Sequence, residues 1–152
     1  MERVSKRNYY LDIAQTVLER ATCLRRVYGA IIVKNDEIIS TGYNGAPRGR
    51  VNCSELGYCN REQLRIPSGQ RYELCRSVHA EANAITKVAK SANNCDGSTL
   101  YITAAPCIEC SKLIIQAGIK RVVYCEEYRS EEGLDLLRKV GIECIQREID
   151  ER

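Results

Sequence analysis

The order of hydrophobic and polar positions along the chain predicts alternating helices and strands. From residue 5 to about residue 23, apolar side chains recur every three or four positions, which is typical of an amphipathic helix with one face on a core. Residues 27–34 form a nearly continuous apolar run, as in a buried strand, and a polar turn leads into a second apolar segment at 38–43. These two segments predict a β-hairpin.

The second half of the chain continues the alternation. We expect a helix that Ser77 caps and that runs to about residue 92, then strands at 99–103, 121–125 and 143–147. The two helices between these strands begin at Pro106 and at residue 130 and end at Gly118 and Gly141, with Leu134, Leu137 and Val140 facing inward on the last one. Helical crossovers make the last three strands parallel. The sequence therefore predicts a three-layer α/β/α sandwich on a mixed five-stranded sheet.

Residues 44–76 interrupt this pattern. They show no sustained period, and they contain several Gly and Pro residues and three cysteines. Loops of this length in a compact domain are usually functional or are held by something. We therefore expect a single domain over residues 1–152 with a cysteine-bearing insertion at about 44–76.

Composition limits the classes of function. The chain has 152 residues and a net charge of +3, which is too small and too scattered for a dedicated nucleic-acid surface but suits a small anionic ligand. No apolar run has the length of a membrane span, and the first residues lack the apolar segment of a secretory signal. We therefore expect a cytoplasmic protein with no membrane or nucleic-acid polymer partner. Nine cysteines in a reducing compartment favour metal ligation or catalysis.

The candidate chemistry centres on the one histidine of the chain. Cys107 and Cys110 lie three positions apart at a predicted helix start, where the helix N-terminus stabilises thiolates, and His79 lies in the first turn of another helix. Three ligands of this kind leave one position of a tetrahedral zinc open to water, as in catalytic zinc sites. Glu81 would lie near that water if the metal is in front of the helix end, and it would act as the general acid and base.

Simpler explanations exist for each part of this group. A lone buried histidine is more often a satisfied polar residue than a ligand, and Cys107 with Cys110 alone would also suit a redox pair or half of a structural zinc site. The redox interpretation gives His79 and Glu81 no role. The combination therefore favours catalytic zinc.

Through His79, Glu81, Cys107 and Cys110, the chain resembles the cytidine and deoxycytidylate deaminase superfamily, and the resemblance extends over residues 17–140. The segment Ser40-Thr41-Gly42-Tyr43-Asn44-Gly45 resembles a Gly-Tyr-Asn-Gly segment of the deoxycytidylate branch, as do the insertion before His79 and residues 113–120. The resemblance implies hydrolytic deamination of dCMP to dUMP and ammonia. It also implies that Asn44 holds the sugar hydroxyl, that the Ala80 N–H meets the pyrimidine carbonyl, and that Tyr128 lies beside the substrate.

A 5′-phosphate needs cations or N–H groups. Arg25, Arg26 and Arg48 lie on loops at the expected mouth of the site, and we take Arg26 as the candidate ligand while leaving the choice among the three open. The resemblance further implies a hexamer regulated by dCTP with Mg²⁺ and, in the opposite sense, by dTTP. Lys87 and Lys90 could take part in such regulation, although two lysines at this spacing are usually a solvated face.

Four further thiols suit a closed tetrahedral zinc, and they are Cys23, Cys53, Cys59 and Cys75. Three others fall on or beside predicted strands or a loop and are expected to be plain thiols: Cys95, Cys125 and Cys144. Some relatives carry a second, structural zinc here, with cysteine ligands where Cys23 and Cys53 fall and histidines in place of the other two. We therefore predict a second zinc that orders the insertion.

Two other functions share these sequence features. A related zinc deaminase could act on another base, such as cytidine, tRNA adenosine or a modified nucleotide; the tRNA enzyme would be expected to have a more basic surface. A non-catalytic zinc-binding module would keep the metal ligands but has no reason to keep Glu81.

Overall fold

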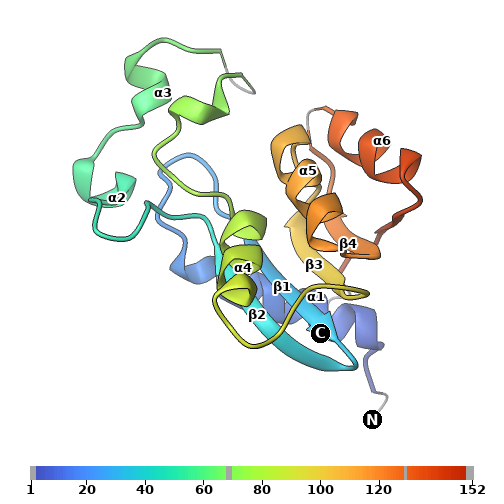
Figure 1. Ribbon diagram of the computed structural model, residues 1–152. Coiled ribbons are helices and arrows are strands. Elements are labelled where there is room, and N and C mark those ends of the chain that lie inside the picture. Colours follow the sequence, from blue (N-terminus) through green and yellow to red (C-terminus); the bar gives the residue numbers. More distant parts are fainter. Residues whose placement is uncertain (1–2, 68–69, 129, 150–152) are drawn as a thin grey trace.

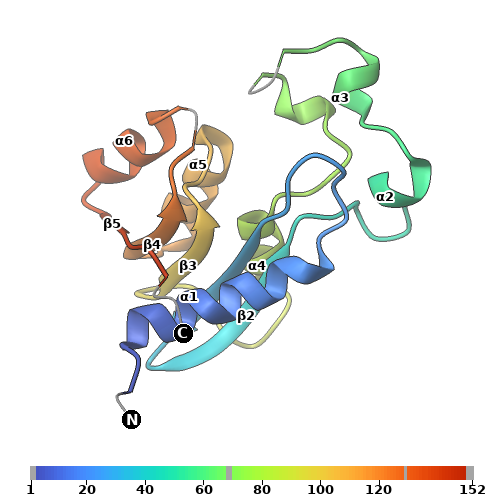
Figure 2. The ribbon, with the colours of Figure 1, turned by 180° about the vertical axis from the view of Figure 1, so that it is seen from behind.

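The fold is built on one mixed sheet of five strands. The computed structural model describes residues 3–67, 70–128 and 130–149 (Figures 1 and 2). The sheet order is β2-β1-β3-β4-β5, in which β2, β1 and β3 are antiparallel neighbours and β3, β4 and β5 are parallel. The strands are β1 Gly29–Lys34, β2 Glu37–Tyr43, β3 Thr99–Ala104, β4 Arg121–Glu126 and β5 Glu143–Gln146. The predicted mixed sheet with an antiparallel hairpin edge is confirmed.

Helices cover both faces of this sheet. They are α1 Lys6–Val17, α2 Cys53–Leu56, α3 Asn60–Gln63, α4 Ala80–Ala89, α5 Ile108–Ala117 and α6 Glu132–Lys139, with 3₁₀ turns at Leu18–Arg20 and Tyr72–Leu74. Helix α1 lies on one face, and α4, α5 and α6 lie on the other (Figures 1 and 2). This is the predicted three-layer α/β/α sandwich. In the described part of the chain, no helix has the length and apolar character needed to cross a membrane.

Two apolar clusters hold the layers together. On the α1 face, Leu11 packs with residues of β1, β3 and β4 such as Ile31 and Val123. On the other face, a larger cluster includes Ile114 of α5 and Leu137 of α6. Alternate residues of β1 and β4 point to the two clusters, which explains why these strands are apolar throughout and not alternating.

Several helix ends differ from the sequence prediction. Ser77 is not the cap of α4; Val78 forms an isolated antiparallel bridge with Gly45, so the chain stays extended for two more residues and His79 is the N-cap. Helix α5 begins at Ile108 with Cys107 as its N-cap, two residues later than predicted. The expectation that Val140 faces inward is wrong, because its side chain is 53% exposed just beyond the end of α6. Gly118 ends α5 in the left-handed conformation, as predicted.

The insertion forms a lobe at the α4 and β2 side of the sandwich, away from α6 (Figures 1 and 2). It contains two four-residue helices, α2 and α3, and the 3₁₀ turn at Tyr72–Leu74. Elements this short leave no periodic signal, which agrees with the lack of a period at 44–76. Cys53 is the first residue of α2 and Cys59 is the N-cap of α3.

Candidate active site

Two helix starts bring the three predicted metal ligands together. His79 is the N-cap of α4, Cys107 is the N-cap of α5, and Cys110 lies in the first turn of α5. His79 Nδ1 is 3.3 Å from Cys110 Sγ and 3.5 Å from Cys107 Sγ. All three ligand atoms lie within 4.8 Å of one another, and they form the one such group that the described residues contain.

The donor set and spacing suit zinc. With a Zn–N bond of about 2.1 Å and Zn–S bonds of about 2.3 Å at tetrahedral angles, nitrogen and sulfur would be about 3.6 Å apart, close to both measured distances. The group also offers three ligands and not four. The residues therefore fit a zinc ion with one position left for another ligand.

The contact between the two thiols shifts their pKa values in opposite directions. The hydrogen bond from Cys110, with a second from His79, lowers the pKa of Cys107 to about 4, whereas the same contact and burial raise the pKa of Cys110. Burial alone would lower the pKa of His79, but its hydrogen bond with Cys107 and the charge of Glu81 raise it. The group thus already holds negative charge on sulfur, which a divalent cation would neutralise.

Glu81 is a buried carboxyl beside this group. It is 5% exposed in the first turn of α4, and burial raises its pKa to about 7. The carboxyl also interacts with Cys110 by a hydrogen bond and with His79 by charge. A carboxyl whose pKa is near neutral can both accept and return a proton at physiological pH, as an acid and base catalyst requires.

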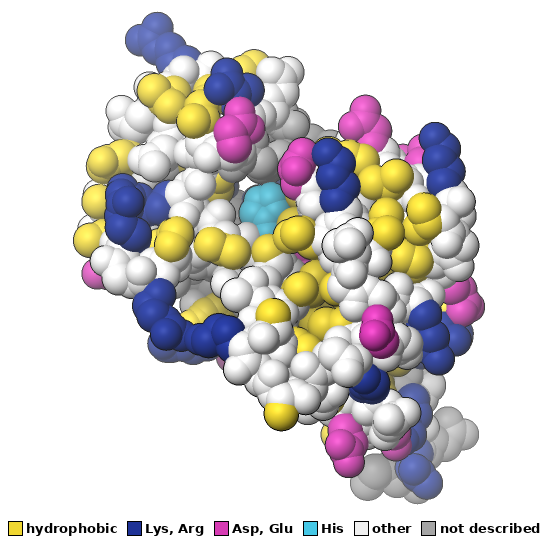
Figure 3. All heavy atoms as spheres, in the orientation of Figure 1, with side chains coloured by type: hydrophobic (Ala, Val, Ile, Leu, Met, Phe, Trp, Pro, Cys, Tyr) yellow, Lys and Arg dark blue, Asp and Glu magenta, His cyan; other side chains and the backbone are white. Residues whose placement is uncertain are grey.

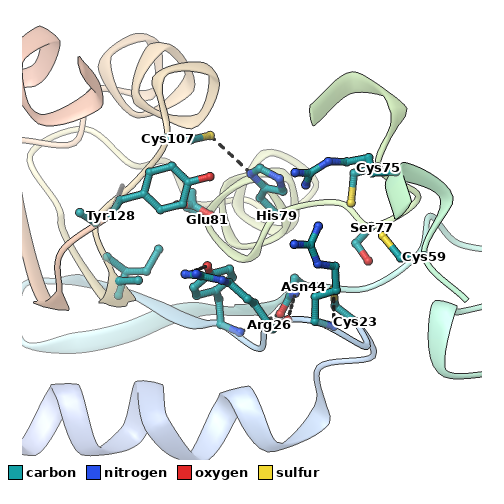
Figure 4. Close-up of a pocket in the computed structure, with 16 residues that line it drawn as sticks. Cys23, Arg26, Asn44, Cys59, Cys75, Ser77, His79, Glu81, Cys107 and Tyr128 are labelled. Carbon is teal, nitrogen blue, oxygen red and sulfur yellow. Dashed lines mark hydrogen bonds between the residues drawn. The ribbon is translucent and has the colours of Figure 1, made fainter. Parts of the chain in front are cut away.

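A pocket opens in front of these residues (Figures 3 and 4). In Figure 3 the ring of the one histidine is visible at the bottom of a hollow. Figure 4 shows Tyr128 at one end, His79 and Glu81 in the middle, and Cys59 with Cys75 at the far end. Apolar residues of β3 and the following loop, Ile102, Ala104 and Ala105, complete the lining.

Asn44 lines this pocket, but its side chain already makes two hydrogen bonds to backbone groups. Its side-chain oxygen accepts from the Tyr28 N–H at 2.8 Å, and its NH₂ donates to the Arg26 carbonyl at 2.8 Å. The amide still has one N–H and one lone pair for a sugar hydroxyl. Tyr128 also lines the pocket, and Ala80 is the buried first residue of α4, whose N–H has no acceptor within its own helix.

The cations of the pocket differ from the predicted set. Arg25 and Arg26 line it, whereas Arg48 is exposed and is not among the lining residues. Arg61 of α3 also lines it and is 7% exposed. The sequence prediction missed Arg61, because the aperiodic insertion gives no signal of which side chains are buried.

The four remaining predicted ligands are neighbours in the insertion. Cys53 is buried, and burial is the main cause that raises the pKa of its thiol; a contact with Ser77 opposes this shift, and the nearby thiols of Cys23, Cys75 and Cys59 add to it. Three of these thiols, all except Cys53, line the pocket opposite Tyr128 (Figure 4). Within the described residues, they do not reach the 4.8 Å spacing of the first group.

Comparison with known proteins gives a consistent result. The family profile described as the cytidine and deoxycytidylate deaminase zinc-binding region matches residues 4–126. The chain is 39% identical to ComE operon protein 2 of Bacillus subtilis, over 99% of this chain and 76% of that protein. It is 37% identical to the deoxycytidylate deaminase of Enterobacteria phage T4, over 91% of this chain and 88% of that enzyme.

A solved structure extends the likeness to three dimensions. It is the dCMP deaminase of cyanophage S-TIM5 in complex with dCMP and dUMP, with a TM-score of 0.80 and 35% identity. The match covers 97% of this chain and 100% of that one.

Proposed function

The chain belongs to the cytidine and deoxycytidylate deaminase family, and from this membership and the pocket we propose that it is a zinc-dependent dCMP deaminase. It converts dCMP and water into dUMP and ammonia. The observation that carries the proposal is the buried Glu81 carboxyl beside the His79, Cys107 and Cys110 group, at the base of a pocket that also holds arginines.

Each residue of the site has its own role in the proposed reaction. His79, Cys107 and Cys110 would hold zinc, which when bound supplies an acidic water and so a nucleophile at neutral pH. The Glu81 carboxylate accepts a proton from the attacking water and gives it to the ring nitrogen of the base. It then transfers the second proton of that water to the amine, which leaves as ammonia. Tyr128 and the apolar residues of β3 enclose the base and exclude bulk water, which strengthens these interactions.

The remaining contacts orient the substrate. The Ala80 N–H would donate to the pyrimidine carbonyl, and the free N–H and lone pair of the Asn44 amide would meet the sugar hydroxyl. Arg26, on the loop before β1, would approach the 5′-phosphate. These roles are supported by the places of the three residues in or beside the pocket.

Ammonia release from dCMP, CMP, deoxycytidine and adenosine tests the proposal. We expect the wild type to prefer dCMP and the Glu81→Gln variant to lose about 10²- to 10⁴-fold in kcat while keeping its zinc. Release from none of the four substrates by zinc-loaded protein, or full activity of Glu81→Gln, would refute the mechanism. A preference for adenosine would favour the family members that act on other bases.

We also propose a second, structural zinc on Cys23, Cys53, Cys59 and Cys75. Two observations support it. Four neighbouring thiols are donors that suit zinc, and the insertion is made of short elements that a bound metal would order. Metal analysis should find two zinc ions per wild-type chain and one in Cys59→Ser. A single zinc ion in the wild type, unchanged in Cys59→Ser, would refute the second zinc site.

The other family properties stay predictions for this chain. They are a hexameric assembly, regulation by dCTP with Mg²⁺ and by dTTP, and a cytoplasmic location that keeps the thiols reduced. Lys87, one of the candidate effector residues, donates to the Thr41 carbonyl at 2.9 Å and lies 5.9 Å from the centre of the Tyr43 ring. Sizing by light scattering and rate measurements with added dCTP would test assembly and regulation.

A further inference from the structure

Asn52, in the insertion, stands at the start of α2 but does not cap this helix with its side chain. By position it is the N-cap residue of α2, and an asparagine there usually accepts a hydrogen bond from one of the first N–H groups of its own helix. The Asn52 side chain makes no such bond. Its partners therefore lie in other segments, and they show what the residue does.

The side-chain oxygen of Asn52 accepts hydrogen bonds from two segments outside α2. The hydroxyl of Thr22, on the loop after α1, donates to it at 3.1 Å, and the N–H of Ala46, just after β2, donates to it at 3.1 Å. The NH₂ group of Asn52 donates to the Glu55 carboxylate of α2 at 3.0 Å. One half-buried side chain thus joins the loop after α1, the segment after β2 and the helix α2.

The first two of these segments carry residues that line the pocket (Figure 4). Asn44 lies two residues before Ala46, and Arg26 lies four residues after Thr22. The Thr22 N–H donates to the Asn44 carbonyl at 3.0 Å. The residue whose hydroxyl binds Asn52 therefore also holds the backbone of Asn44.

The orientation of the Asn44 amide depends on the spacing of these two segments. Asn44 is 4% exposed, and its side chain accepts from the Tyr28 N–H and donates to the Arg26 carbonyl, both on the loop after α1. If that loop moves relative to residues 44–46, the amide must turn or lose one of these bonds. Asn52 fixes the spacing from behind the pocket, since it is not among the described residues that line it.

We propose that Asn52 is a positioning residue for substrate binding, which joins the loop after α1 to residues 44–46 and so holds the Asn44 amide toward the sugar of the nucleotide. The inference rests on the proposed function and deepens it. Glu81 lies on α4, to which none of the three hydrogen bonds of the Asn52 side chain is made. Loss of Asn52 should therefore weaken substrate binding and leave the chemical step as it is, which raises KM at unchanged kcat.

Steady-state kinetics with dCMP separate this role from that of a helix cap. Serine caps helices as well as asparagine does, but its side chain is too short to bind Thr22 and Ala46 together. We expect KM for dCMP to rise about 10-fold in both Asn52→Ala and Asn52→Ser, the order for loss of one or two hydrogen bonds, with kcat within about threefold of wild type. Asn93→Ala is the matched control, because the Asn93 side-chain oxygen also accepts from a backbone N–H, at 2.9 Å, but in the loop after α4; both constants should stay at wild-type values.

A swap of amide and carboxyl groups supplies the rescue. The double variant with Asn52→Asp and Glu55→Gln keeps an acceptor oxygen for Thr22 and Ala46 and reverses the bond to α2, since the introduced amide donates to the introduced carboxylate. Its net charge equals that of wild type, and we expect its KM within about threefold of wild type. Asn52→Asp alone places two carboxylates in contact and should raise KM. Thr22→Val, which removes only the hydroxyl donor, should raise KM about threefold and tests the same network if Asn52→Ala does not fold.

The outcomes separate the inference from the proposed function. Wild-type KM in folded Asn52→Ser would overturn the inference, because a helix cap would then be sufficient. A KM in the double variant as high as in Asn52→Ala would overturn it too. Zinc is measured in each variant, since Cys53 is the next residue, and a KM that returns to the wild-type value when zinc is added would assign the effect to the metal and also overturn it. If the zinc-loaded wild type does not deaminate dCMP, the proposed function fails and the inference fails with it.

Discussion

Replacement of Gly42 by alanine should displace the helix that carries His79 and Glu81. Gly42 lies in β2 directly under α4, and a Cβ at this position would be 2.2 Å from the Ala80 carbonyl oxygen and 2.6 Å from the Ala84 N. Real Cβ contacts are essentially never under 3.0 Å. The helix must therefore retreat by about 0.8 Å for the shorter contact alone to become tolerable.

Two hydrogen bonds that join α4 to β2 oppose this movement. Ser40 donates to the Ala84 carbonyl at 2.7 Å, and the Asn83 side chain donates to the Tyr43 carbonyl at 2.8 Å. Overpacking of this kind typically costs about 1–3 kcal/mol of stability. A misplacement of about 1 Å can lower a rate by about 10²-fold, so we expect Gly42→Ala to lose about 10- to 100-fold in kcat/KM for dCMP.

The assay must separate misplacement from loss of stability. Leu11→Ala is the control, because Leu11 is fully buried on α1, across the sheet from the metal ligands. We expect Leu11→Ala to lose about 2–5 kcal/mol in urea unfolding but to keep wild-type kcat/KM where it is folded. Activity of the folded, zinc-loaded Gly42→Ala variant within about threefold of wild type would show that the contact between β2 and α4 does not position the site.

Two further predictions concern stability. Leu137→Ala should lower the free energy of unfolding by about 2–5 kcal/mol because Leu137 is fully buried, whereas Val140→Ala, at an exposed position, should change it by less than about 0.5 kcal/mol; urea unfolding of both variants checks this. Hydrogen bonds from Lys6 and Tyr10 hold the pKa of Asp36 below its usual value. Ionised Asp36 therefore stabilises the folded protein at pH values above the usual pKa, and this stabilisation is lost as the pH falls through the lower pKa of the folded state. Thermal unfolding of Asp36→Asn should therefore show a smaller drop in Tm than wild type between about pH 5 and pH 2, and an equal drop would contradict the reasoning.

The sandwich was predictable because each of its elements carries a local signal. The apolar run of β1, the turn at Asn35 and Asp36, and Gly118 at the end of α5 all act within a few residues. Asn35 and Asp36 both adopt positive φ, which matches the two-residue turns that hairpins prefer. The crossover rule then fixed the parallel half of the sheet.

The errors at the helix starts come from pairing between distant segments. Ser77 is a good capping residue, but the bridge of Val78 with Gly45 keeps the chain extended past it, and a bridge over this sequence separation leaves no local pattern. The shift has a chemical effect, since it makes His79 the N-cap. As the cap, its side chain points away from the helix toward Cys107 and not along a helix face.

The same reasoning explains why the metal-binding group was easier to predict than the arginines of the pocket. Metal ligands are recognised from residue type and spacing, because few structures other than a zinc site need one histidine, one carboxyl and a paired cysteine motif in that order. In the sequence, an arginine that lines the pocket looks like any other arginine, because only the folded structure shows its burial. Arg61 is distinguished only by its burial on α3, next to Glu62, which pairs with Arg25 of the loop after α1. His79, Glu81, Cys107 and Cys110 belong to two helices of the sandwich, so a change within the insertion can alter the rest of the pocket lining while these four residues stay in place.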